Sequence, residues 1–157
     1  MEERDIRFLR QAFVIAQRAR EHGNHPFGAL LVSPDSNVLL EAENTVITES
    51  DCTGHAEMNL VRNASKRFDR AFLLRCTLYA STEPCVMCAG AIFWSYISRL
   101  VYGLSSARLY ELVGKSSTDP HPRLSCREVL AGGGSRVEVI GSALEAEAEE
   151  VHEGFWH

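Results

Sequence analysis

The sequence predicts an α/β fold, a three-layer α/β/α sandwich built around a mixed five-stranded sheet. The chain has 157 residues, the length of one domain. Helical and strand-like hydrophobic patterns alternate along it, which is typical of a sheet covered by helices on both faces. Strand patterns at 27–32 and 38–42 flank the turn sequence Ser-Pro-Asp-Ser-Asn, which predicts an antiparallel hairpin and therefore a mixed sheet. With no repeat and no linker, residues 1–157 are expected to form a single domain.

Each element has its own signal. Apolar residues recur at steps of three or four over 6–20, which predicts an amphipathic helix that ends before Gly23. After the hairpin comes a polar loop over 44–53. Helical patterns are expected over 54–68, 85–96, 107–113 and 143–153. The remaining strands are expected at 77–80, 100–102 and 137–140. The longest loop, rich in Gly, Ser and Pro, covers 114–123.

The charge distribution and the cysteine content argue against several classes of function. The net charge is −5, and the segment from residue 137 onward holds six Glu and no Lys or Arg. Nucleic-acid-binding domains usually concentrate Lys and Arg, so this acidic end argues against that class. No apolar run approaches the roughly 20 residues that cross a bilayer, and no secretory signal is recognisable, so a cytoplasmic protein without membrane contact is expected. Five cysteines in such a protein favour metal binding or catalysis over disulfides.

Two short segments carry the chemistry, His55-Ala56-Glu57 and Pro84-Cys85-Val86-Met87-Cys88. Cysteines three residues apart lie on one helix face, and the free N–H groups of a helix start favour thiolates. Two thiolates and the neutral imidazole of His55 suit Zn²⁺ and leave a fourth position open for water, whose pKa falls to about 7 in such sites. Glu57 is then predicted to act as general base and general acid, worth about 10²–10⁴-fold in rate.

Taken separately, these residues have ordinary explanations. A lone C-x-x-C also occurs in four-ligand structural zinc sites and in redox pairs. A structural site needs a second close pair of ligands, and His22 and His25 only flank a helix end. A thioredoxin-like pair follows the first strand of its domain, whereas this pair comes late. Together the two segments match the zinc-deaminase signature H-x-E…P-C-x-x-C, which favours one catalytic zinc ion per chain.

Around these motifs the sequence resembles the cytidine deaminase-like superfamily, in the branch of guanine deaminases, yeast-type cytosine deaminases and bacterial tRNA adenosine deaminases. The resemblance covers most of the chain. It rests on Pro-Phe-Gly-Ala at 26–29, Asn44, Gly-His-Ala-Glu at 54–57 and Thr-Glu-Pro-Cys-Val-Met-Cys-Ala-Gly-Ala at 82–91. It implies the cytidine deaminase-like fold, zinc ligation by His55, Cys85 and Cys88, and proton transfer by Glu57. It also implies that the Asn44 side chain and the Ala56 N–H bind the substrate.

The expected reaction is hydrolytic release of ammonia from a free nucleobase or nucleoside of the guanine or cytosine type. Trp94 resembles the base-stacking Trp of guanine deaminases, and Phe27 offers a second ring face. Against guanine, the Gly-Phe-Asp-Asp-like segment of those enzymes is replaced at 107–112 by Ala-Arg-Leu-Tyr-Glu-Leu. Phe155 and Trp156 resemble the aromatic tail that covers the pocket in yeast-type cytosine deaminases. Each of these rings has the alternative of simple packing.

Two other functions stay open, a tRNA-specific adenosine deaminase that makes inosine and an inactive, zinc-stabilised binding module. The residues at 86–91 resemble the tRNA enzymes, and Arg62, Lys66 and Arg70 form a stripe suited to phosphates. The acidic end favours a small substrate, and Glu57 with an open zinc position argues against an inactive module. The resemblance also implies a homodimer formed through the helices that follow the ligand motifs. The apolar surface expected for it comprises Ile92, Phe93, Tyr96 and Ile97.

Overall fold

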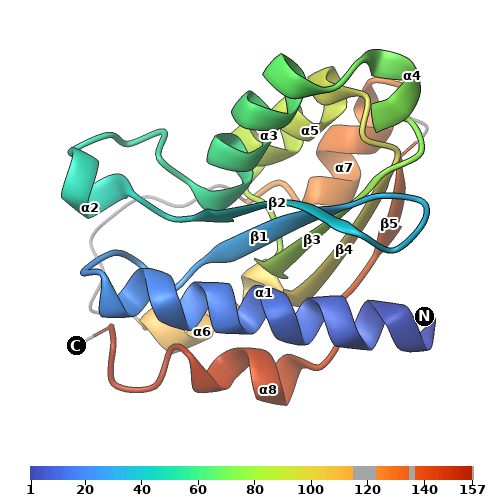
Figure 1. The fold of residues 1–157 in the computed structure, drawn as a ribbon. Coiled ribbons are helices and arrows are strands. Elements are labelled where there is room, and N and C mark those ends of the chain that lie inside the picture. The colour runs from blue at the N-terminus through green and yellow to red at the C-terminus, as the bar shows by residue number, and fades with distance from the viewer. Residues whose placement is uncertain (115–122, 135–136, 157) are drawn as a thin grey trace.

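A five-stranded sheet runs through the computed structural model, which describes residues 1–114, 123–134 and 137–156 (Figure 1). The strands lie in the order β2-β1-β3-β4-β5. β1 pairs antiparallel with β2 and β3, whereas β3, β4 and β5 run parallel. The strand bounds are β1 (Gly28–Val32), β2 (Val38–Glu43), β3 (Thr77–Thr82), β4 (Arg99–Leu104) and β5 (Glu138–Ile140). The mixed five-stranded sheet predicted from the sequence is confirmed.

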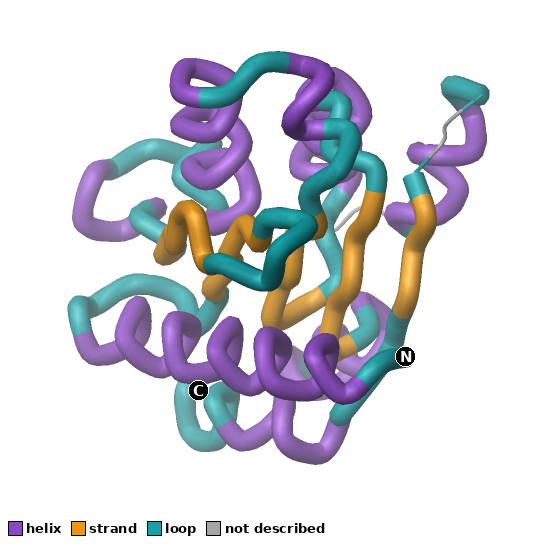
Figure 2. The backbone as a smooth tube through the Cα atoms, turned by 45° about the vertical axis from the view of Figure 1, so that its right-hand side comes forward, coloured by secondary structure: helices purple, strands orange, loops and turns teal. Residues whose placement is uncertain are grey.

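Helices cover both faces of this sheet (Figures 1 and 2). The first layer contains α1 (Glu3–Glu21), α6 (Ser106–Val113) and α8 (Glu145–Glu150). The second layer contains α3 (Ala56–Arg67), α4 (Arg70–Leu73), α5 (Val86–Ser95) and α7 (Cys126–Gly132). Because every residue of the central strands β1 and β3 is buried, each layer packs its own apolar cluster on the sheet. The α/β/α sandwich is therefore confirmed.

The layer of α1 lies unusually close to the sheet at Gly28. A Cβ atom at this position would lie 2.5 Å from the Ala16 backbone nitrogen and 2.8 Å from the Ala12 carbonyl oxygen. Glycine is required here because any side chain would push the helix away from β1. The close approach fixes the start of β1, and with it Phe27, against the rest of the molecule.

Three short helices were not expected from the sequence: α4, α7 and α2 (Val46–Glu49), which lies in the predicted polar loop. Each depends on side-chain caps rather than on apolar periodicity. Asp69 accepts a hydrogen bond from the Phe72 N–H, Ser125 and Glu128 form a capping box, and the Asn24 side chain accepts from the Ile47 and Thr48 N–H groups.

The predicted loop over 114–123 falls outside the described residues, apart from its two ends. None of the helices that the structure describes combines the length and the apolar character needed to cross a membrane.

Candidate metal and active site

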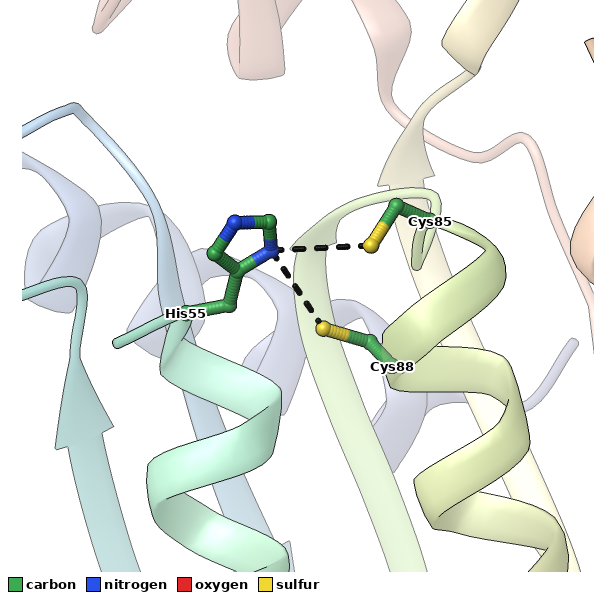
Figure 3. A group of neighbouring side chains, drawn as sticks. All are labelled: His55, Cys85 and Cys88. Atoms are coloured by element: carbon green, nitrogen blue, oxygen red, sulfur yellow. Dashed lines mark hydrogen bonds between the residues drawn. The ribbon is translucent and has the colours of Figure 1, made fainter. Parts of the chain in front are cut away.

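The starts of α3 and α5 bring the two sequence motifs together (Figure 3). His55 is the N-cap residue of α3 and Cys85 is the N-cap residue of α5, with Cys88 one turn further along the same helix. The His55 Nδ1 atom lies 3.5 Å from Cys85 Sγ and 3.5 Å from Cys88 Sγ. All three potential ligand atoms lie within 4.8 Å of one another.

This donor set fits zinc in both chemistry and spacing. With Zn–N and Zn–S bonds of standard length, adjacent N and S ligands of a tetrahedral ion are about 3.6 Å apart. The observed distances of 3.5 Å from the imidazole nitrogen to each sulfur match this value. Three protein donors leave one tetrahedral position for water or substrate, as in catalytic rather than structural zinc sites.

The two thiols hold their protons unequally. Hydrogen bonds from Cys88 and His55 stabilise the Cys85 thiolate and lower its pKa to about 4, against the effect of burial. The contact with Cys85, together with burial, raises the pKa of Cys88. The Cys85 position is thus already suited to a thiolate, and a divalent cation between the sulfurs favours deprotonation of both.

Glu57 lies in the first turn of α3 with only 5% of its surface exposed. Burial raises the pKa of its carboxyl group, because a charged carboxylate loses hydration there. The group also contacts the Cys88 thiol and therefore lies beside the candidate metal ligands. A buried carboxyl of raised pKa next to an open metal position has the properties of a proton shuttle.

The expected substrate-binding groups Asn44 and Ala56 lie on the segments that flank this site. Asn44 follows β2 and is 1% exposed, and its Oδ1 atom accepts a hydrogen bond from the Val46 N–H. Its amide NH₂ group has no acceptor among the residues that the structure describes. The Ala56 N–H at the start of α3 also has no acceptor among the described residues. Two donors are therefore free for a ligand.

An aromatic cluster joins Phe27 to the C-terminal segment. The Phe27 ring lies 5.6 Å from the His152 ring and 6.1 Å from the Trp156 ring. His25 stacks on Trp156 at 5.7 Å and meets the edge of Phe155 at 5.9 Å. The structure thus brings Phe27, Phe155 and Trp156 together in one cluster.

The sequence did not predict that His25 and His152 belong to this cluster. His25 directly precedes the Pro-Phe-Gly turn, and this position was the available signal for it. No local sequence pattern indicated His152, because its partner Phe27 lies near the other end of the chain.

Trp94 lies apart from this cluster. It is 74% exposed at the far end of α5, about 14 Å along the helix from Cys85 at 1.5 Å per residue. With Arg70, Tyr96 and other residues it lines a separate cavity of about 190 Å³. Within one chain it does not line the metal site.

The expected apolar dimer surface also needs correction, because the side chains of Ile92 and Ile97 are fully buried in the core. Phe93 and Tyr96 are half-buried, and the exposed residue on this part of α5 is Trp94, which was not included in the expected surface.

Comparisons with known proteins agree with this geometry. Residues 2–104 match the family model described as the cytidine and deoxycytidylate deaminase zinc-binding region. The chain is 43% identical over 156 residues to a probable cytosine deaminase from Schizosaccharomyces pombe, covering 99% of this chain and 94% of that protein. It is 45% identical over 103 residues to the tRNA-specific adenosine deaminase of Haemophilus influenzae, covering 66% of this chain and 60% of that protein.

Among solved structures, the guanine deaminase from Nitrosomonas europaea has a TM-score of 0.76 at 24% identity. The match covers 92% of this chain and 80% of that one, and it shows the shared fold. Together with the family match and the relative aligned over nearly the full length, this likeness leads to one conclusion. The chain belongs to the family of zinc-binding cytidine and deoxycytidylate deaminases and is a zinc-dependent, hydrolytic deaminase.

Proposed function

We propose that residues 1–157 act as one deaminase domain that releases ammonia from a free nucleobase or nucleoside in the cytoplasm. One observation carries this proposal. An imidazole and two thiols at the starts of α3 and α5 converge with the spacing of zinc ligands, beside the buried carboxyl of Glu57. The proposed ligands are His55, Cys85 and Cys88, and the proposed catalytic residue is Glu57.

The roles of the protein groups follow from their chemistry. Zinc in an open three-ligand site supplies a Lewis acid that activates water near neutral pH. Glu57 accepts a proton from the attacking water and delivers it to the ring nitrogen of the substrate. It then transfers the second proton of that water to the amino group, which leaves as ammonia. Its burial suits both steps, because a carboxyl whose pKa is raised toward the working pH can both accept and donate a proton.

The substrate-binding groups are the two free donors and the aromatic cluster. The Asn44 amide donates a hydrogen bond to the substrate, and the Ala56 N–H binds its carbonyl oxygen. Phe27 offers a ring face, and Phe155 and Trp156 cover the pocket from the C-terminal side. A buried pocket of this kind selects a flat heterocycle by stacking and by matching its polar edge.

A cytosine-type pyrimidine is the first substrate to test. The probable cytosine deaminase aligns along nearly the whole chain, including the aromatic C-terminal segment. The tRNA-specific relative matches only 103 residues. The Arg62 guanidinium donates to Asn59 and Arg70 lies over the Tyr96 ring at 3.9 Å, so two of the three cations in the proposed phosphate stripe already have partners.

The assembly that we propose is a homodimer formed through the end of α5. Phe93 and the exposed ring of Trp94 lie side by side there at 5.2 Å, and an apolar pair on a helix surface is suited to contact with a second copy.

Ammonia release from a panel of substrates tests the proposal. Zinc-loaded protein is incubated with cytosine, cytidine, guanine, adenosine and a tRNA anticodon stem-loop, with inosine formation as the readout for the RNA. Turnover of a free base or nucleoside, strongest with cytosine, is the expected result. Inosine formation in the stem-loop alone would establish the tRNA function instead, and no turnover of any substrate would contradict the proposed activity.

A further inference from the structure

Glu83 lies on the segment between β3 and α5, two residues before Cys85. Its backbone N–H donates to the Leu104 carbonyl oxygen at 2.7 Å, which continues the pairing of β3 with β4. Its carboxylate connects two distant parts of the chain. Oε2 accepts a hydrogen bond from the Ser106 N–H at 2.9 Å, and Oε1 accepts one from the Cys126 N–H at 3.1 Å.

These two donors occupy equivalent positions, because Ser106 and Cys126 are the first residues of α6 and α7. In each helix a serine N-cap already serves the third N–H group. Ser105 accepts from the Arg108 N–H, and Ser125 accepts from the Glu128 N–H. The first N–H of each helix is left without an acceptor within its own helix, and the Glu83 carboxylate satisfies both. A negative charge at two helix starts is also favoured by the helix dipoles.

The contact with α7 is supported by packing. Cys126 and Leu130 of α7 lie in the same buried cluster as Ala89 and Ile92 of α5, the helix that carries Cys88. Cys126 is fully buried, and burial together with the neighbouring Glu83 carboxylate raises the pKa of its thiol to about 12. Docked α7 therefore keeps this thiol unreactive, and any opening of the helix start makes it reactive.

We propose that Glu83 is a positioning residue, which couples the Cys85 segment to the starts of α6 and α7 so that zinc binding and α7 docking stabilise each other. The inference rests on the proposed zinc site and is independent of the substrate. The coupling is reciprocal by thermodynamic necessity: if Glu83 helps to hold the zinc ligands, zinc must also hold α7 in place. Groups hydrogen-bonded directly to metal ligands typically change metal affinity by about 10- to 100-fold when removed, and Glu83, which acts through the segment of Cys85, is expected at the lower end of this range.

Two readouts test the coupling without measuring activity. Zinc affinity is determined by competition with a chelating fluorophore for wild type, Glu83→Gln and Glu83→Ala. The alkylation rate of each cysteine is then followed by peptide mass spectrometry, with and without zinc. Cys126 reports on α7, and buried Cys76, which lies before β3, reports on global unfolding. Ser125→Ala is the matched control, since it removes a cap from α7 and leaves the Cys85 segment untouched.

We expect zinc to slow alkylation of Cys126 in the wild type at least tenfold, with Cys76 unchanged. Glu83→Ala should weaken zinc binding about tenfold and make Cys126 reactive with or without zinc. Glu83→Gln, which keeps one acceptor oxygen, should lie between them. Ser125→Ala should speed alkylation of Cys126 and, because α7 stays docked in most molecules, lower zinc affinity much less than Glu83→Ala does.

Other outcomes would overturn the inference. These are wild-type zinc affinity in both Glu83 variants, or a wild-type Cys126 alkylation rate that is the same with and without zinc. Fast labelling of Cys76 would show that both Glu83 variants unfold. In that case the alkylation rate of Cys126 in the wild type, with and without zinc, still tests whether zinc binding and α7 docking are coupled. A wild-type chain that binds no zinc would instead refute the proposed site itself.

Discussion

Arg99 and Asp5 form a two-point ion pair at the start of β4, with Nη1 2.8 Å from Oδ1 and Nη2 2.9 Å from Oδ2. Asp5 is fully buried and also accepts a hydrogen bond from the Tyr79 hydroxyl at 2.7 Å. Burial alone would raise the pKa of Asp5, but the hydrogen bonds from Arg99 and Tyr79 hold it well below its usual range. This network ties the first turn of α1 to two central strands of the sheet.

Removal of the buried charge should destabilise the fold. Asp5→Asn leaves the Arg99 guanidinium without its buried partner, and we expect the free energy of unfolding at pH 7 to fall by about 3 kcal/mol. Urea denaturation measures this difference. Glu147→Gln, which breaks the exposed pair with Arg10, should cost less than about 1 kcal/mol. Equal effects in the two variants would contradict the assigned importance of the buried pair.

The same pair predicts a pH dependence. Because the pKa of Asp5 is lowered in the folded state, its contribution is fully present above about pH 4, the value of a free aspartate. It is lost progressively as the pH falls below that value. The difference in unfolding free energy between wild type and Asp5→Asn should therefore shrink between pH 4 and pH 2. A difference that stays constant over this range would exclude the linkage.

His152 predicts a second pH dependence, at higher pH. Trp156 Nε1 donates a hydrogen bond to His152 Nδ1 at 3.1 Å, which requires that nitrogen to be unprotonated. Burial lowers the pKa of His152 from 6.5 to about 4. Since the unfolded chain binds this proton first, stability is retained above pH 6.5 and lost as the pH falls from 6.5 to 4.

We expect wild type to lose about 2 kcal/mol more than His152→Gln between pH 7 and pH 4.5, measured by urea denaturation. His22→Gln, which replaces an exposed histidine outside the aromatic cluster, is the matched control. Parallel pH profiles for wild type and His152→Gln would show that His152 does not titrate as the structure implies.

A substitution at Asn44 can distinguish its structural role from its proposed role in substrate binding. Asn44→Asp keeps the oxygen that accepts from the Val46 N–H but loses the free NH₂ donor. We expect kcat/KM to fall about 100-fold, because a polar edge of the bound substrate is left unpaired, while zinc content stays unchanged. Steady-state kinetics with the substrate found in the ammonia assay measure the effect. Asn37→Asp, in the exposed hairpin turn, adds the same charge and should leave kcat/KM unchanged.

Local patterns explain why most of the fold was predictable. The apolar steps over 6–20 reflect burial of one face of α1 against the sheet, and the turn at 33–37 determines the β1–β2 hairpin. The cluster of candidate zinc ligands was predictable because a metal site restricts both residue type and spacing. In contrast, α7 has little apolar periodicity in seven residues, and only the capping box of Ser125 and Glu128 indicated it.

Long-range contacts explain what the sequence could not reveal. His152 meets Phe27 across the whole chain, and Glu83 meets Cys126 through a hydrogen bond between residues 43 positions apart. Neither pairing leaves a local pattern. For Trp94 the residue type was misleading. An aromatic ring is suited to base stacking, but the position of Trp94 on α5 places its side chain on the surface, far from Cys85.

The rate of ammonia release by a Glu57→Ala variant of known zinc content tests the central claim most directly. The variant should bind one zinc ion per chain, like wild type, because His55, Cys85 and Cys88 remain. Its turnover should fall by about 10²–10⁴-fold, the usual contribution of a general acid–base residue. Near-normal turnover in the zinc-loaded variant would contradict the proposed proton transfer by Glu57.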